Sequence, residues 1–153
     1  MTLAWQTLEK HGWQQWLKES EMVEQDAFGP KVLRCKNGEY IKIFRIKHKI
    51  SLARLRNPAA RFCRNAEKLR SLGIDTLTPL ALYRIPHLDR WAVHYAPLAG
   101  DTLRGLLKHF SLPEKTIGEL GRYIAHLHDK GIYFRSLHPG NIVLQPNGKL
   151  GLI

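Results

Sequence analysis

The chain has 153 residues, of which 44% are hydrophobic and 24% charged, so it is long enough for one domain with a buried core and excludes a wholly disordered chain. Two cysteines are too few for a disulfide framework, and neither a membrane-spanning apolar run nor an export signal is present, so we expect a cytoplasmic protein. The net charge of +11 comes from residues 31–70, which carry 13 Lys and Arg against two Glu, and this excess predicts an anionic partner or a solvated basic face.

The predicted elements begin with a helical segment over residues 5–24. Its tryptophans and leucines recur at roughly helical intervals, and we interpret them as a packing face. Next, two β-rich runs at 31–35 and 39–45 flank Asn37-Gly38, the strongest short signal for a β-hairpin. Asn57-Pro58 then predicts the start of a helix that ends at Gly73.

The second half of the sequence predicts further strands and helices. These are strands at 77–83 and 90–95, a short helix from an Asp101 cap, a long helix from a capping box at 111–114 to Gly131, and a hairpin at 142–144 and 149–153. Strands and helices are segregated along the chain, so the predicted fold class is α+β.

Lys42 is the first candidate functional residue. It lies in the middle of a predicted strand whose two faces are both apolar. A buried ammonium needs a carboxylate or an anionic ligand, and Glu67, the only acid of the basic helix, is the candidate partner. The alternatives are a lysine that extends to solvent at a strand edge and a surface glutamate.

The second candidate site is the polar loop between the long helix and the last hairpin. Phe134, Arg135 and Ser136, with Asn141 five residues after Ser136, resemble the His-Arg-Asp and Asn pattern of the catalytic loop of protein-kinase-like folds. The order of elements is similar too: a strand lysine, a helix glutamate, two strands, a linker and a long helix. More narrowly, residues 133–138 and 148–153 resemble the bacterial lipopolysaccharide core kinase-like family, in its toluene tolerance protein branch.

The resemblance implies a fold and a set of ligands. The fold would be a kinase-like small lobe, an antiparallel sheet plus one helix, over residues 28–97, preceded by a helical extension (1–27) and followed by the first part of a helical large lobe (98–153). ATP and Mg²⁺ would be the cofactors. The implied nucleotide-binding residues are Lys42, Glu67, Tyr95 and Ala96, and the implied catalytic-loop residues are Arg135, Ser136, His138 and Asn141, with Asn141 as the metal ligand.

Two departures from the family pattern predict weak or absent phosphoryl transfer. Ser136 stands where the family has the catalytic aspartate, and a hydroxyl is a poor proton acceptor, which costs on the order of 10²–10⁴ in rate. His138 is the candidate replacement base. The sequence also ends at Ile153, before the expected metal-binding aspartate. The predicted function is therefore that of a relative of lipopolysaccharide core sugar kinases that is inactive or very weak.

Two other functions remain as alternatives. One is a non-catalytic pseudokinase or scaffold module, and the other is a basic nucleic-acid-binding domain, which ranks last because no nucleic-acid-binding signature is present. The predicted partners are an anionic membrane surface, at the inner membrane, or a lipopolysaccharide precursor. We also expect self-association through an incompletely packed large-lobe surface at 117–127.

Overall fold

The computed structural model describes residues 3–45, 57–133 and 138–153. The chain forms two compact units. Unit 1 comprises Met1–Lys68 and Leu77–Pro97, and unit 2 comprises Leu69–Thr76 and Leu98–Ile153. Across the described ranges the architecture is α+β, and none of their helices combines the length and apolarity needed to cross a lipid bilayer.

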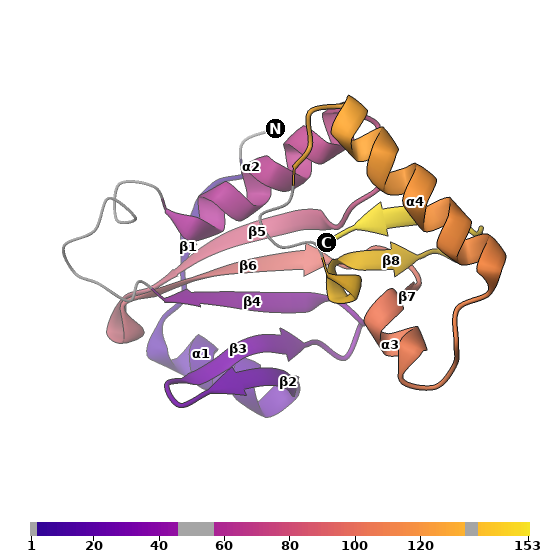
Figure 1. The fold of residues 1–153 in the computed structure, drawn as a ribbon. Coiled ribbons are helices and arrows are strands. Elements are labelled where there is room, and N and C mark those ends of the chain that lie inside the picture. Colours follow the sequence, from indigo (N-terminus) through magenta and orange to yellow (C-terminus); the bar gives the residue numbers. More distant parts are fainter. Residues whose placement is uncertain (1–2, 46–56, 134–137) are drawn as a thin grey trace. The chain divides into compact units, whose positions relative to one another are not determined.

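Unit 1 is built on a six-stranded, mostly antiparallel sheet with the strand order β1-β5-β6-β4-β3-β2 (Figure 1). Among the described strands of this sheet, only β1 and β5 pair in parallel. The strands are β1 (Trp5–Thr7), β2 (Glu21–Asp26), β3 (Gly29–Arg34), β4 (Tyr40–Arg45), β5 (Thr78–Ile85) and β6 (Arg90–Ala96).

Two hydrophobic clusters show that the two faces of this sheet are covered by different helices. α1 (Lys10–Glu19) supplies Trp13 to one cluster, which also contains Ile41 and Ile43 of β4. α2 (Pro58–Ser71) contributes to the other cluster, against which Phe44 of β4 packs. Successive side chains of a strand point to opposite faces, so β4 presents its odd-numbered isoleucines to α1 and its even-numbered residues to α2.

The N-terminal prediction of one helical segment over 5–24 is wrong at both ends. Only Lys10–Glu19 is helical, and the flanking residues form β1 and β2. β2 is an edge strand with all six residues exposed, and its pairing with β3 contains register shifts. Such a strand carries no alternating apolar pattern, because neither of its faces is buried, and its pairing with β3 prevails over local propensity.

The central predictions are confirmed. β3 and β4 form the antiparallel hairpin predicted around Asn37-Gly38. Asn57 caps α2, since its Oδ1 accepts hydrogen bonds from the backbone N–H of Ala59 at 2.9 Å and of Ala60 at 3.2 Å. The two strands predicted after this helix are β5 and β6, which pair antiparallel.

The described residues of unit 2 form a three-stranded sheet in the order β7-β8-β9 and two α-helices. Its core contains Leu103, Leu127, Ile142 and Leu152, all almost fully buried. The elements are β7 (Asp101–Thr102), α3 (Leu103–Leu107), α4 (Glu114–Asp129), β8 (Ile142–Leu144) and β9 (Leu150–Leu152).

The caps of the helices in unit 2 differ in part from the prediction. Thr102, not Asp101, caps α3, and its Oγ1 accepts a hydrogen bond from Gly105 N at 3.1 Å. α4 follows Pro113 with no side-chain cap, so the predicted capping box does not form. The end of α4 is as predicted: Gly131 has a φ of 72°, a left-handed conformation that glycine adopts without strain.

Candidate functional site

Lys42 lies in the middle of β4, on the sheet face that α2 covers. In the sheet register it is opposite Val32 of β3 and Val93 of β6. Val93 is fully buried in the cluster to which α2 contributes. Lys42 itself is half-buried. Its charged side chain therefore extends over a largely apolar surface, as the sequence predicts.

The Lys42 ammonium lies against one ring of an aromatic cluster. Nζ lies 5.1 Å from the centroid of the Phe62 ring, which α2 contributes. Phe62 in turn contacts Phe44 and Tyr95, each at 5.7 Å between ring centroids, and Tyr95 stacks on Tyr40 at 5.8 Å. A cation over an aromatic ring is attracted by its negative face, a contact that contributes about 0.5–2 kcal/mol depending on desolvation.

No carboxylate forms an ion pair with Lys42 in the described part of the chain, which includes all 13 Asp and Glu. Glu67, the predicted partner, is exposed on α2. Its charge acts on Cys63 instead: burial, and then the Glu67 carboxylate, raises the pKa of that thiol to about 11. The structure thus places Lys42 and Glu67 in the same unit without pairing them.

Burial also determines the electrostatics of Lys42. It lowers the pKa of the ammonium from its ordinary value of 10.5, because desolvation disfavours the charged form. The Glu24 carboxylate partly opposes this shift, and the Lys31 ammonium adds to it. Lys42 is therefore a partly desolvated cation whose charge is only distantly compensated.

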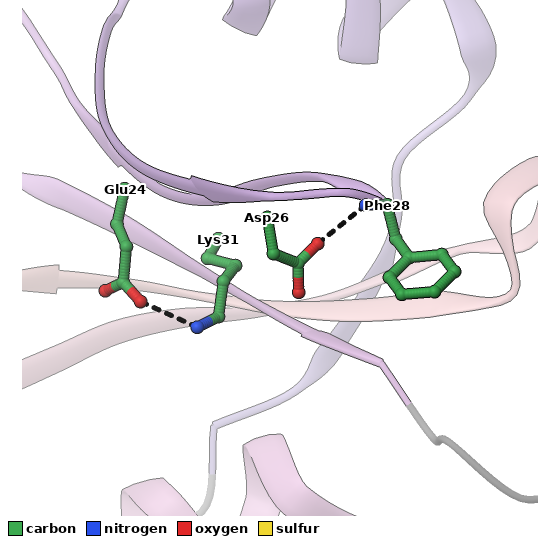
Figure 2. A network of polar contacts seen from close by, with 4 residues as sticks. All are labelled: Glu24, Asp26, Phe28 and Lys31. Atoms are coloured by element: carbon green, nitrogen blue, oxygen red, sulfur yellow. Dashed lines mark hydrogen bonds and ion pairs between the residues drawn. The ribbon is translucent and has the colours of Figure 1, made fainter.

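The hairpin of β2 and β3 carries the carboxylate that acts on Lys42 (Figure 2). Glu24 is opposite Val32, which is itself opposite Lys42, so the three residues form one row across the sheet. Glu24 Oε1 accepts a hydrogen bond from Lys31 Nζ at 2.6 Å, an exposed ion pair. Because Glu24 is already paired with Lys31, it leaves much of the Lys42 charge uncompensated.

The tip of the same hairpin is held by a hydrogen bond within the turn and by contacts with two arginines. Asp26 Oδ1 accepts a hydrogen bond from Phe28 N at 2.8 Å, which closes the turn (Figure 2). The Arg45 guanidinium lies 3.4 Å from the centroid of the Phe28 ring, and Arg90 Nη2 donates to the Phe28 carbonyl oxygen. Arg45 and Arg90 are opposite each other in the sheet, so this end of unit 1 presents two adjacent cations.

The two other predicted nucleotide-binding residues end β6. Tyr95 is opposite Tyr40, and burial, followed by the effects of Tyr40 and Glu24, raises its pKa to about 12. Ala96 is opposite Thr78 and half-buried. Of the four predicted residues, the structure therefore brings Lys42 and Tyr95 into one cluster, through Phe62.

In unit 2, His138 caps the N-terminus of a short 3₁₀ turn, η3 (Pro139–Asn141), and Asn141 is its last residue. His138 Nδ1 accepts a hydrogen bond from Gly140 N at 3.0 Å, and Arg104 Nη2 lies 3.4 Å from the same nitrogen. The Asn141 backbone N–H donates to the His138 carbonyl at 3.0 Å, and the Asn141 carbonyl accepts from Ile153 N at 3.0 Å. With Nδ1 used as a cap, the proton of the neutral imidazole is on Nε2.

The described residues of the predicted catalytic loop do not assemble a metal site. Arg135 and Ser136 lie outside the described residues. Within the described ranges there is no group of three or more His, Cys, Asp and Glu that could hold a metal ion. Asn141 alone offers a neutral oxygen ligand, and a hard divalent cation is normally held by carboxylates as well. We therefore derive no reaction step through Mg²⁺.

A separate concave site lies in unit 2. It has a volume of about 420 Å³ and is lined by side chains of both charges, Arg122 and Lys149 together with Asp75 and Glu119. The Tyr123 hydroxyl is buried at this site, and burial raises its pKa. Because the opposite charges balance, this site has no evident preference for an anion, unlike the surroundings of Lys42.

Two residues of the Lys42 site were not found from the sequence. Phe62 belongs to the apolar stripe of its helix, where the pattern predicts packing alone. Glu24 falls in a segment predicted as helical. Its position in the same row as Lys42 results from the pairing of β2 with β3, which the sequence did not predict. No protein-family model matches the chain.

Proposed function

We propose that this chain is a kinase-like protein related to bacterial lipopolysaccharide core sugar kinases, in which Lys42 holds the phosphates of a nucleotide and phosphoryl transfer is weak or absent. The observation that carries the proposal is the position of Lys42 on the α2 face of the sheet. In protein kinases a strand lysine, working with the helix that follows it, binds the nucleotide phosphates. Here β4 is likewise followed by α2 and then by two further strands.

Weak transfer is supported by three features. Lys42 faces a phenylalanine on α2 where a kinase has a carboxylate. The sequence has Ser136 at the position of the catalytic aspartate, and a hydroxyl is a poor base. The third feature is His138, whose Nδ1 is already engaged by Gly140 N and is therefore not free to accept a proton from a substrate hydroxyl.

Thermal unfolding in the presence of ATP tests the nucleotide site. We expect ATP to raise the unfolding temperature of the full chain, because ligand that binds only the folded state stabilises it. At a hundredfold excess over Kd the gain is about 2.7 kcal/mol. Lys42→Met should abolish this shift, whereas Lys36→Met, which removes an exposed cation of the same unit, should retain it. An unchanged unfolding temperature of the wild type would refute nucleotide binding and leave the scaffold alternative.

A second candidate function is association with an anionic membrane surface, which the charge distribution favours. The excess of 13 basic over two acidic residues within 31–70 accounts for the whole net charge of +11. Each Lys or Arg close to an anionic membrane contributes about 1 kcal/mol at physiological salt. We expect the chain to sediment with vesicles that contain anionic lipid, and to be released by high salt. Binding to purely zwitterionic vesicles of the same size would argue against an electrostatic attraction.

A further inference from the structure

We propose that Phe62 is the residue that determines how Lys42 binds an anion. Its ring occupies the position of α2 that faces the Lys42 ammonium, so a cation–π contact takes the place of an ion pair. Lys42 can then bind a phosphate group directly, and this binding needs no divalent cation. The inference rests on the proposed function in one respect, namely that the ligand carries phosphate.

The geometry distinguishes Phe62 from the other candidates on α2. The Phe62 ring is 5.1 Å from Lys42 Nζ and is held in place by contacts with Phe44 and Tyr95. Glu67 is five residues further along the helix, which is about 500° of rotation at 100° per residue, or 140° around the helix from Phe62. It therefore projects from a different side of α2 and is exposed.

The charged and titratable groups around Lys42 come from three other elements: β2 contributes Glu24, β3 contributes Lys31 and β6 contributes Tyr95. α2 contributes the uncharged Phe62. On β4 itself the titratable neighbour on the same face is Tyr40. The single carboxylate among them is already paired with Lys31 at 2.6 Å.

This arrangement has a chemical consequence. In a lysine–glutamate pair the carboxylate competes with an incoming anion for the ammonium, and it also keeps the lysine charged. A phenyl ring attracts the ammonium but has no oxygen or nitrogen atom that could accept a hydrogen bond from it. The N–H donors of Lys42 therefore stay available for a ligand. A phosphate oxygen can then accept a charge-assisted hydrogen bond directly from Nζ.

Three variants of the full chain test the inference: Phe62→Met, which removes the ring at similar volume, Phe62→Glu, which adds the missing carboxylate, and Glu67→Gln as the matched control. The first readout is the pKa of the Lys42 amine, followed by NMR of isotope-labelled lysine. We expect Phe62→Glu to raise it by about one to three units and Phe62→Met to lower it by about half a unit. Glu67→Gln should leave it unchanged.

The second readout is the affinity for inorganic pyrophosphate, measured calorimetrically with a chelator present. We expect the wild type and Glu67→Gln to bind equally, Phe62→Met to bind within about threefold of them, and Phe62→Glu to bind at least about tenfold more weakly, because the new carboxylate competes with the ligand. If Phe62→Glu does not fold, the pKa of Lys42 in Phe62→Met decides the matter, since an unchanged value would overturn the role of the ring.

The outcomes separate this inference from the proposed function. Binding of pyrophosphate but not of ATP, together with the expected loss of affinity in Phe62→Glu, refutes the nucleotide function and supports the role of Phe62. Binding of neither ligand by the wild type overturns the inference, as does a Glu67→Gln variant that shifts the Lys42 pKa as much as Phe62→Glu does.

Discussion

Lys42 illustrates, at the scale of a single residue, how a charged group can conflict with the fold that holds it. The side chains next to it in sequence, Ile41 and Ile43, are buried in the cluster on the α1 face. Lys42 points to the opposite face, where Phe62 and the other aromatic rings of the cluster partly desolvate it. No carboxylate among the described residues pairs with it there. A local conflict of this kind is typical of functional positions.

We predict that Lys42→Met stabilises the protein at pH 7. Removing a partly buried cation relieves its desolvation, and a gain on the order of 1 kcal/mol corresponds to a rise of about 2–4 °C in the unfolding temperature of a chain of this size. Thermal unfolding of the wild type and the variant, followed by circular dichroism, measures the difference.

The same prediction has a definite pH dependence. The folded-state pKa of Lys42 lies below 10.5, its ordinary value, which we take for the unfolded chain. Between these two values the unfolded chain binds more protons, so the stability of the wild type rises with pH in this window. The advantage of Lys42→Met should therefore shrink as the pH approaches 10.5. An advantage that is constant or grows with pH would contradict the assigned burial, and Lys36→Met provides the exposed control.

At the scale of the element, α2 depends on its first turn to position Phe62. Asn57 Oδ1 accepts hydrogen bonds from two of the first backbone N–H groups of the helix, Ala59 N and Ala60 N. These groups have no partner within the helix, so their satisfaction stabilises the N-terminal turn that precedes Phe62. The cap therefore supports both the stability of α2 and the geometry of the Lys42 site.

We predict that Asn57→Ala lowers the free energy of unfolding by about 1 kcal/mol, within the usual range for loss of such a cap. Asn57→Asp keeps a carbonyl-type acceptor at the same position and should retain most of the stability. Urea unfolding of the three proteins provides the comparison. Equal stability of the wild type and Asn57→Ala would show that the two hydrogen bonds contribute nothing in solution.

The elements also show how far the sequence could predict this structure. Local signals identified the β3–β4 hairpin, α2 and the end of α4. The structural effects of Asn37-Gly38, Asn57 and Gly131 extend over only a few neighbouring residues, so the sequence alone shows them. β2 was missed because its residues are exposed on both faces, and only its pairing with β3 distinguishes it from helix. Lys42 was found from its apolar neighbours, which a strand places on defined faces.

The partner of Lys42 could not be found in the same way. Glu67 was the natural choice because it is the only acid in the basic helix, and sequence shows charge but not the rotation of a helix about its axis. A rotation of 100° per residue decides whether position 62 or position 67 faces the strand. That rotation follows from the packing of Ala59, Phe62 and Cys63 against the sheet, which is a tertiary property.

At the scale of the whole molecule, unit 2 exposes several large apolar side chains. Phe110, Ile117 and Tyr133 have 70%, 56% and 75% of their surface accessible. Ile117 lies on α4, the helix whose outer surface the sequence predicts to be incompletely packed. Single exposed apolar residues are normal, and unit 1 exposes large ones too, but the two most exposed, Tyr133 and Phe110, both belong to unit 2, and side chains of this kind favour association.

We predict that the chain self-associates reversibly through this surface, and that Ile117→Lys reduces the association. Leu80→Lys is the matched control, because Leu80 is also exposed but belongs to β5 of unit 1. Light scattering coupled to size-exclusion chromatography gives the mass as a function of concentration. Contacts between apolar surfaces persist at high salt, whereas contacts that the +11 charge makes with an anion weaken, so raising the salt concentration distinguishes the two. A monomer at every concentration, or equal effects of the two lysine substitutions, would refute an interface on α4.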